Sequence, residues 1–184
     1  LALLNQPPVI TDAATIPGAT EDLPFTVTFS ALATAVDDAD LDGDPISYLV
    51  TEVLSGTLTK NGQPVVPGTT MLNPGESLVW TPALNVNGAG IAAFAVRAYD
   101  GIAFSAAANP GNIFIEVAPA NDAPVVDDQS FSVDENLAID TVVGTVLASD
   151  VDAGDTHTFT LTGSAFAINS SSGQITVAGS INYE

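Results

Sequence analysis

Alternation of apolar and polar residues dominates the chain and predicts β-strands. Phe25, Val27 and Phe29 alternate with polar residues, which is the period of a half-buried strand. No helical period persists anywhere. Further strands are expected near Val9 and over 46–50, 57–60, 77–81, 91–99 and 112–117. The 57–60 strand leads into Asn61-Gly62, a strong signal for a tight hairpin turn. About seven short strands in one domain length predict a β-sandwich.

A short joint divides the chain into two repeats. Ala120-Asn121-Asp122-Ala123-Pro124-Val125-Val126 echoes Asn5-Gln6-Pro7-Pro8-Val9-Ile10, and both Asn5 to Asn121 and Pro8 to Pro124 are 116 positions apart. Recurrence at a fixed, domain-sized distance indicates a tandem repeat. The prolines stiffen the backbone of each joint and favour an extended residue before them. We therefore expect one domain over residues 1–119 and a second over 120–184.

The second repeat follows the same plan as the first but has fewer strands. Strands are expected over 129–133, 141–147, 156–162, 166–168 and 174–177, with a turn at 170–173. These are five of the seven strands that a complete sandwich would have. Sheet edges without partners invite another strand. We therefore expect either that the chain continues past Glu184 or that another copy completes the second domain.

The charge balance excludes several classes of partner. The chain has 22 acidic residues and two basic ones, Lys60 and Arg97, which gives a net charge of −20 at pH 7. Nucleic acids and anionic membranes bind through positive charge, so neither is expected as a partner. No apolar run reaches about 18 residues, so membrane insertion is not expected either. Cysteine is absent, which excludes disulfides and thiolate chemistry. Inorganic cations are the remaining means of neutralising clustered carboxylates.

Three acidic features recur along the chain. A glutamate follows each joint, Glu21 in the first repeat and Glu135 in the second. An aspartate-rich loop follows the next strand, at 38–44 and again at 150–155. The third feature is Asp100, which precedes a glycine late in the first repeat.

Strand parity predicts where these groups lie. Successive antiparallel strands reverse direction, so alternate loops lie at opposite poles of a sandwich. Glu21 is thereby expected at the C-terminal pole of the first domain, and Asp150 and Asp152 at the N-terminal pole of the second. Asn121 and Asp122 lie between them in the sequence. Calcium takes six to eight oxygen ligands from carboxylates, amides and carbonyls. The pattern therefore predicts an interdomain calcium site.

The same motifs resemble those of tandem cadherin-type repeats in bacterial surface proteins. Asn121-Asp122-Ala123-Pro124 resembles the family's joint, Asp134-Glu135-Asn136 its early glutamate motif, and Asp150-Val151-Asp152 its paired aspartates. Asn182-Tyr183-Glu184 resembles its late acidic motif, which the first repeat lacks, having Trp80-Thr81-Pro82 instead.

The resemblance implies an all-β chain of tandem Greek-key sandwiches, immunoglobulin-like or cadherin-like, the second incomplete, stiffened by Ca²⁺. The implied metal ligands are Glu21, Asn121, Asp122, Asp150, Asp152, Asn5, Asp40, Asp42, Asp100, Glu135 and Glu184.

Other interpretations of these residues are weaker. The loop from Asp38 also fits the start of an EF-hand, but its twelfth position is Leu49 and no helices are expected around it. His157 has no nucleophilic or basic partner pattern and is expected to cap the inward face of a strand. Trp80 is expected in the core, with a sugar-stacking platform as the alternative. Asn169-Ser170-Ser171 matches a glycosylation sequon, a pattern common by chance.

We expect a non-enzymatic, extracellular, calcium-rigidified repeat of a bacterial-type adhesin or surface filament. Its expected partners are neighbouring repeats of the same chain or other copies, and a cell-surface protein or polysaccharide. The alternative is a carbohydrate-binding accessory module of a secreted polysaccharide-degrading enzyme. A row of exposed aromatic residues would favour that alternative.

Overall fold

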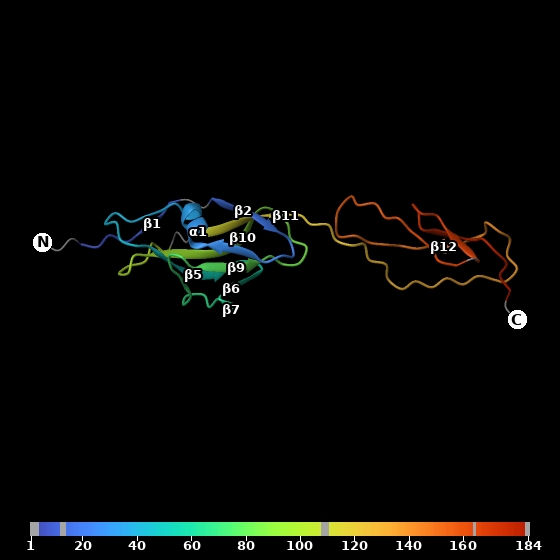
Figure 1. The fold of residues 1–184 in the computed structure, drawn as a ribbon, viewed down its shortest axis with the longest axis horizontal. Coiled ribbons are helices and arrows are strands. Elements are labelled where there is room, and N and C mark those ends of the chain that lie inside the picture. The colour runs from blue at the N-terminus through green and yellow to red at the C-terminus, as the bar shows by residue number, and fades with distance from the viewer. Residues whose placement is uncertain (1–3, 12–13, 108–110, 164, 183–184) are drawn as a thin grey trace. The chain divides into compact units, whose positions relative to one another are not determined.

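The computed structural model describes residues 4–11, 14–107, 111–163 and 165–182. Contacts divide the chain into two compact units, Leu1–Ala120 and Asn121–Glu184, which we call unit 1 and unit 2. Apart from a single helix, the regular secondary structure of the described residues is all β-strand (Figure 1). Within this described part, no helix is long and apolar enough to span a membrane.

Unit 1 is built from two sheets that enclose one core. The strands of the larger sheet, in spatial order, are β2 (Thr15–Thr20), β11 (Gly111–Ala118), β10 (Gly88–Tyr99), β5 (Ser47–Val53) and β8 (Met71–Leu72). Those of the smaller sheet are β3 (Phe25–Thr28), β9 (Ser77–Thr81), β6 (Thr57–Lys60) and β7 (Gln63–Pro64). A separate pair joins β1 (Val9–Ile10) to β4 (Asp38–Ala39). All pairings are antiparallel except that of β2 with β11, which is parallel.

The core of unit 1 lies between these sheets. Trp80 and Leu78 of β9 are fully buried, as are Phe94 of β10 and Ile113 and Ile115 of β11. The indole N–H of Trp80 donates to the Ser55 carbonyl oxygen at 2.8 Å, so the one polar atom of this large ring has a partner. The expectation that Trp80 is a core residue is confirmed, and its burial excludes Trp80 as a sugar-stacking platform.

The helix α1 (Phe29–Val36) was not expected from the sequence. The strand predicted to include Phe29 ends at Thr28, whose side chain accepts the Ala31 N–H at 3.2 Å and caps the helix. Three alanines within the segment favour the helix, and Leu32, Ala35 and Val36 are buried. The prediction that Phe29 belongs to a strand was wrong, because β3 ends at Thr28 and the helix begins at Phe29.

The turns of unit 1 follow their residue types. Asn61 and Gly62 both have positive φ, 51° and 75°, as a type I′ hairpin turn requires, and β6 pairs with β7 across this turn. Asp37 ends α1 in the left-handed region. Strand β2 was not predicted, because Pro17 and Gly18 interrupt its apolar pattern.

The described part of unit 2 contains one sheet of three strands. β12 (Val142–Thr145), β14 (Gln174–Val177) and β13 (Phe166–Ile168) pair in that order. The order matches β3, β9 and β6 of unit 1, so this sheet repeats the smaller sheet of unit 1. The turn at 170–173 forms as predicted, with the Asn169 side-chain oxygen accepting the N–H groups of Ser171 and Ser172.

Two predicted strands of unit 2, over 129–133 and 156–162, are wrong: neither is a strand in the structure. By position in the repeat they correspond to β2 and β5, which in unit 1 bond to β11 and β10. No described strand of unit 2 corresponds to β10 or β11, so these segments lack neighbours for a hydrogen-bonded ladder. Their apolar side chains still cover the sheet. Phe131, Val133 and Leu161 line a hollow together with Val143, Phe166 and Ile175.

Gly56, in the turn between β5 and β6, provides a test of how closely that turn packs against β9. Its φ is 64°, and a Cβ added there would lie 2.2 Å from the Thr81 carbonyl oxygen and 3.0 Å from the Trp80 indole nitrogen. We expect Gly56→Ala to lower the free energy of unfolding of unit 1 by about 3 kcal/mol or more, measured by chemical denaturation.

Gly62→Ala is the matched control. Its φ is also positive, but a Cβ at Gly62 would meet nothing within 4 Å. It should therefore cost only about 1–2 kcal/mol, the conformational penalty alone. Equal losses for the two variants would contradict the close approach of Gly56 to β9.

Candidate metal centres

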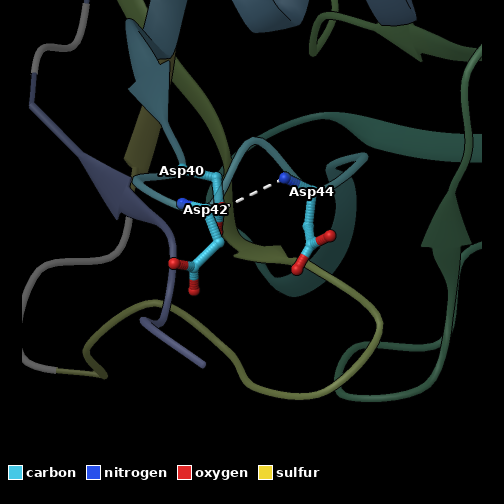
Figure 2. Close-up of side chains that lie close together, drawn as sticks. All are labelled: Asp40, Asp42 and Asp44. Atoms are coloured by element: carbon cyan, nitrogen blue, oxygen red, sulfur yellow. Dashed lines mark hydrogen bonds between the residues drawn. The ribbon is translucent and has the colours of Figure 1, made fainter. Parts of the chain in front are cut away.

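The aspartate loop of unit 1 folds around its own first side chain. It follows β4, and one Asp40 carboxylate oxygen accepts the N–H groups of Asp42 at 2.9 Å and Asp44 at 3.1 Å. Aspartate favours such local turns because its short side chain reaches the backbone two residues on. One carboxylate oxygen from each of Asp40, Asp42 and Asp44 lies within 4.8 Å of the others. Figure 2 shows these three side chains close together.

The other oxygen of Asp40 supports a cation at this loop. Asp40 Oδ2 is buried and has no hydrogen-bond partner among the described residues. A buried carboxylate oxygen without a donor is costly, and in proteins such atoms are rare. Oxygen ligands from three neighbouring carboxylates are the donor set that calcium prefers. The residues of this loop therefore fit a calcium ion.

The N-terminal segment brings further oxygens to the same pole of unit 1. The Gln6 N–H donates to Asp42 Oδ2 at 2.6 Å, and the Asn5 side-chain amide donates to Asp100 Oδ2 at 3.0 Å. Asp100 is buried, 6% exposed. The hydrogen bond from the Ala103 backbone N–H holds the pKa of the Asp100 carboxyl below its usual range. The Asn5 side chain adds to this effect, and burial opposes it. The structure thus brings Asn5, Asp42 and Asp100 to the same end of unit 1.

Unit 2 repeats two of these hydrogen bonds. The Asp122 N–H donates to Asp152 Oδ2 at 2.6 Å, as Gln6 does to Asp42. The Asp152 N–H donates to Asp150 Oδ1 at 3.0 Å, as Asp42 does to Asp40. Carboxylate oxygens of Asp150, Asp152 and Asp155 again lie within 4.8 Å of one another.

The backbone pairing beside these loops is repeated as well. The bridge between Val125 and Ser149 in unit 2 matches the pairing of Val9 with Ala39 in unit 1. The sequence repeat is therefore also a repeat of geometry, in the joint and in the loop that it contacts.

Glu21 lies at the opposite end of unit 1, beside the last residue of that unit. Its side chain is buried, 1% exposed, although it is a carboxylate. Oε1 accepts the Ala120 N–H at 2.7 Å, and Oε2 accepts the side-chain amide of Asn87 at 2.9 Å. The sequence placed Glu21 at this pole but did not assign Asn87 a role. The only signal for Asn87 was an Asn-Gly pair between two predicted strands.

The early glutamate motifs of the two units share a backbone conformation. Asp22 and Asn136, which follow Glu21 and Glu135, have φ values of 61° and 60°. The Glu21 N–H donates to the Ala118 carbonyl oxygen, and the Asn136 N–H donates to that of Ile181, both at 3.0 Å. Glu135 itself is exposed.

The remaining predicted ligands are less informative. Asn121 is exposed, and its side-chain amide donates to the Asp122 carbonyl oxygen at 2.6 Å. Glu184 lies outside the described residues.

The structure also tests the EF-hand interpretation and the prediction for His157. The segment from Asp38 lies shortly after α1, but the strand β5 and not a second helix follows it, so the EF-hand interpretation is excluded. His157 does not cap a strand, since 156–162 is not one, and its ring meets that of Phe159 edge-on at 6.5 Å. The prediction for His157 was wrong because segment 156–162 has no neighbouring strand among the described residues with which to pair.

Comparison with known proteins agrees with the repeat. The bacterial Ig domain family matches residues 5–109 and again residues 121–184. No curated protein sequence matches the chain significantly.

Among solved structures, the human protocadherin-24 EC1-2 fragment (form II) is 23% identical with a TM-score of 0.56, over 97% of this chain and 80% of that one. The mouse cadherin-23 EC22-24 fragment is 22% identical with a TM-score of 0.54, over 97% of this chain. This chain spans 56% of the length of the cadherin-23 fragment. Such identities establish a shared fold. With two matched segments that cover most of its length, the chain belongs to the bacterial Ig domain family, as a tandem repeat with a cadherin-like β-sandwich fold.

Proposed function

We propose that this chain is a non-enzymatic spacer of a bacterial surface or secreted protein, and that its aspartate loops bind calcium. The observation that carries the proposal is the duplicated loop, in which two units use the same hydrogen bonds to gather three carboxylates beside a joint. Solvated acidic surfaces have no need of such repeated geometry.

The chemistry of the loops favours calcium over other metals. Their donors are carboxylates, with amides and backbone carbonyls nearby, and cysteine is absent from the chain. Hard oxygen donors suit calcium and magnesium, whereas zinc and copper favour nitrogen and sulfur. Magnesium requires a compact octahedron and releases water reluctantly, so a site built from several protein oxygens suits calcium better.

In each unit the proposed ligands come from the loop and from groups close to it. In unit 1 they are Asp40, Asp42 and Asp44, with Asn5 and Asp100 nearby. In unit 2 they are Asp150, Asp152 and Asp155, with Asp122 bonded to Asp152. Glu21, Asn121, Glu135 and Glu184 stay predicted ligands.

Calcium bound in unit 2 would stiffen the joint by a simple electrostatic effect. Like charges about 4 Å apart repel by roughly 1 kcal/mol in water and by several times more at a protein surface. A cation removes this repulsion from the loop that holds the Asp122 N–H. The joint segment is then anchored to unit 2, which suits a spacer at a cell surface. Adhesion to other copies, to a surface protein or to a polysaccharide is a further proposed role.

Calcium should stabilise unit 2 to heat. Sites in extracellular modules commonly have dissociation constants of about 10⁻⁴ to 10⁻³ M, so 10 mM calcium would contribute about 1.4 kcal/mol at the weaker limit. For a unit of this size that corresponds to a rise in Tm of roughly 5–10 °C, measured by calorimetry with and without a chelator. Magnesium at the same concentration should give a smaller rise.

A pair of variants with the same change in charge tests the ligand assignment. Asp152→Asn should weaken calcium binding by about tenfold or more in a calorimetric titration, while its oxygen can still accept the Asp122 N–H. Asp128→Asn alters an exposed aspartate outside both loops and should bind like the parent. Equal affinities for all three proteins would remove Asp152 from the site.

Calcium should also restrict the motion between the two units. We expect small-angle scattering to show a narrower distribution of the radius of gyration in calcium than in chelator, since the cation anchors the joint to unit 2. The effect should be lost in Asp152→Asn and kept in Asp128→Asn. Identical scattering with and without calcium would contradict the stiffening role.

A further inference from the structure

Glu21 is a buried carboxylate, and the hydrogen bonds that its oxygens accept from the described residues come from amide groups. Within the described residues, the one ion pair of the chain joins Lys60 to Glu76, far from Glu21 in the sequence. Each Glu21 oxygen has one donor instead: Ala120 N–H on Oε1 and the Asn87 side chain on Oε2.

These two bonds join three separate segments of unit 1. Glu21 lies in the turn between β2 and β3, Asn87 in the loop between β9 and β10, and Ala120 just beyond β11. The partners are 66 and 99 residues from Glu21 in the sequence. A second bond joins the same turn and loop, because the Asn85 N–H donates to Asp22 Oδ1 at 2.8 Å. The end of unit 1 is thus tied to two loops by hydrogen bonds.

We propose that Asn87 is a positioning residue that holds the Glu21 carboxylate against the Ala120 N–H, and that this amide clamp orders the end of unit 1 independently of calcium. The clamp consists of Glu21, Asn87 and Ala120. The inference goes beyond the calcium-binding function and does not depend on it.

The amide of Asn87 is suited to this position. A buried carboxylate needs donors, and hydrogen bonds to a charged acceptor are stronger than those between neutral groups. Among residues of this size, asparagine supplies an N–H₂ group, whereas ionised aspartate only accepts. Asn87→Asp would therefore place a second carboxylate against Glu21.

The start of unit 2 is held by different chemistry. There the Asp122 N–H bonds to Asp152, whose carboxylate lies among those of Asp150 and Asp155. Like charges gathered in a loop need a counter-ion, whereas the Glu21 carboxylate already has an amide donor on each oxygen. The clamp therefore predicts that calcium removal leaves Ala120 ordered.

Hydrogen exchange of the Ala120 N–H in the full chain, measured by NMR, tests the clamp. In excess chelator, the parent should keep the protection that it shows in calcium. Asn87→Ala should raise the exchange rate at Ala120 by at least tenfold and lower the Tm of unit 1 by about 5 °C, with or without calcium. Asn112→Ala, on the exposed face of β11, is the control and should leave both unchanged.

A double-mutant cycle separates the clamp from a general packing role of Asn87. In a Glu21→Ala background the carboxylate is gone, so Asn87→Ala should lower the Tm much less than in the parent. An equal loss of Tm in both backgrounds would overturn the clamp, as would loss of protection at Ala120 in the parent on chelation alone. If these variants contradicted the clamp while calcium affinity stayed as proposed, the calcium site would be unaffected. The two proposals can therefore be disproved independently.

Discussion

The structure depends on how clustered carboxylates obtain hydrogen-bond donors in a chain with 22 acidic and two basic side chains. One basic residue, Lys60, pairs with Glu76, and the other, Arg97, bonds to the Ser105 carbonyl oxygen. The acidic groups at the ends of the units bond instead to backbone N–H groups and to asparagine amides. Each of these bonds also fixes a piece of backbone, so the loops gain order from the groups that would otherwise repel one another.

Two kinds of acidic site result from this constraint. At Glu21 each carboxylate oxygen has an amide donor, and the side chain is buried. In the aspartate loops the local donors satisfy only part of each carboxylate, and Asp40 keeps a buried oxygen without a donor among the described residues. The first kind has a protein donor on each carboxylate oxygen, whereas the second has a buried oxygen to which no described group donates and therefore suits a cation. The chain thus contains both carboxylates that are held by amide donors and carboxylates that are suited to a cation.

Strand pairing imposes the other main constraint. Segments 129–133 and 156–162 have strand-like sequences and still pack apolar side chains over the sheet of unit 2. They are not strands, because a ladder needs a neighbour with free N–H and C=O groups in register. In unit 1 β10 and β11 fill that place between β2 and β5. Side-chain alternation thus reports the tendency to form a strand, while pairing depends on distant residues.

The repeat, the all-β class and most of the strands follow from the amino-acid sequence alone. Periodicity and turn residues are local properties, so 57–60, 77–81, 166–168 and 174–177 are strands with the predicted bounds. The positions of Glu21 and the aspartate loops at opposite poles also followed from strand order alone. Helix α1 could have been predicted only by recognising that Thr28 caps a helix, against the strand-like alternation of the residues before it. The contact of Asn87 with Glu21, and the buried Asp40 oxygen to which no described group donates, could not be predicted from the sequence, because they depend on which distant segments meet and how closely they pack.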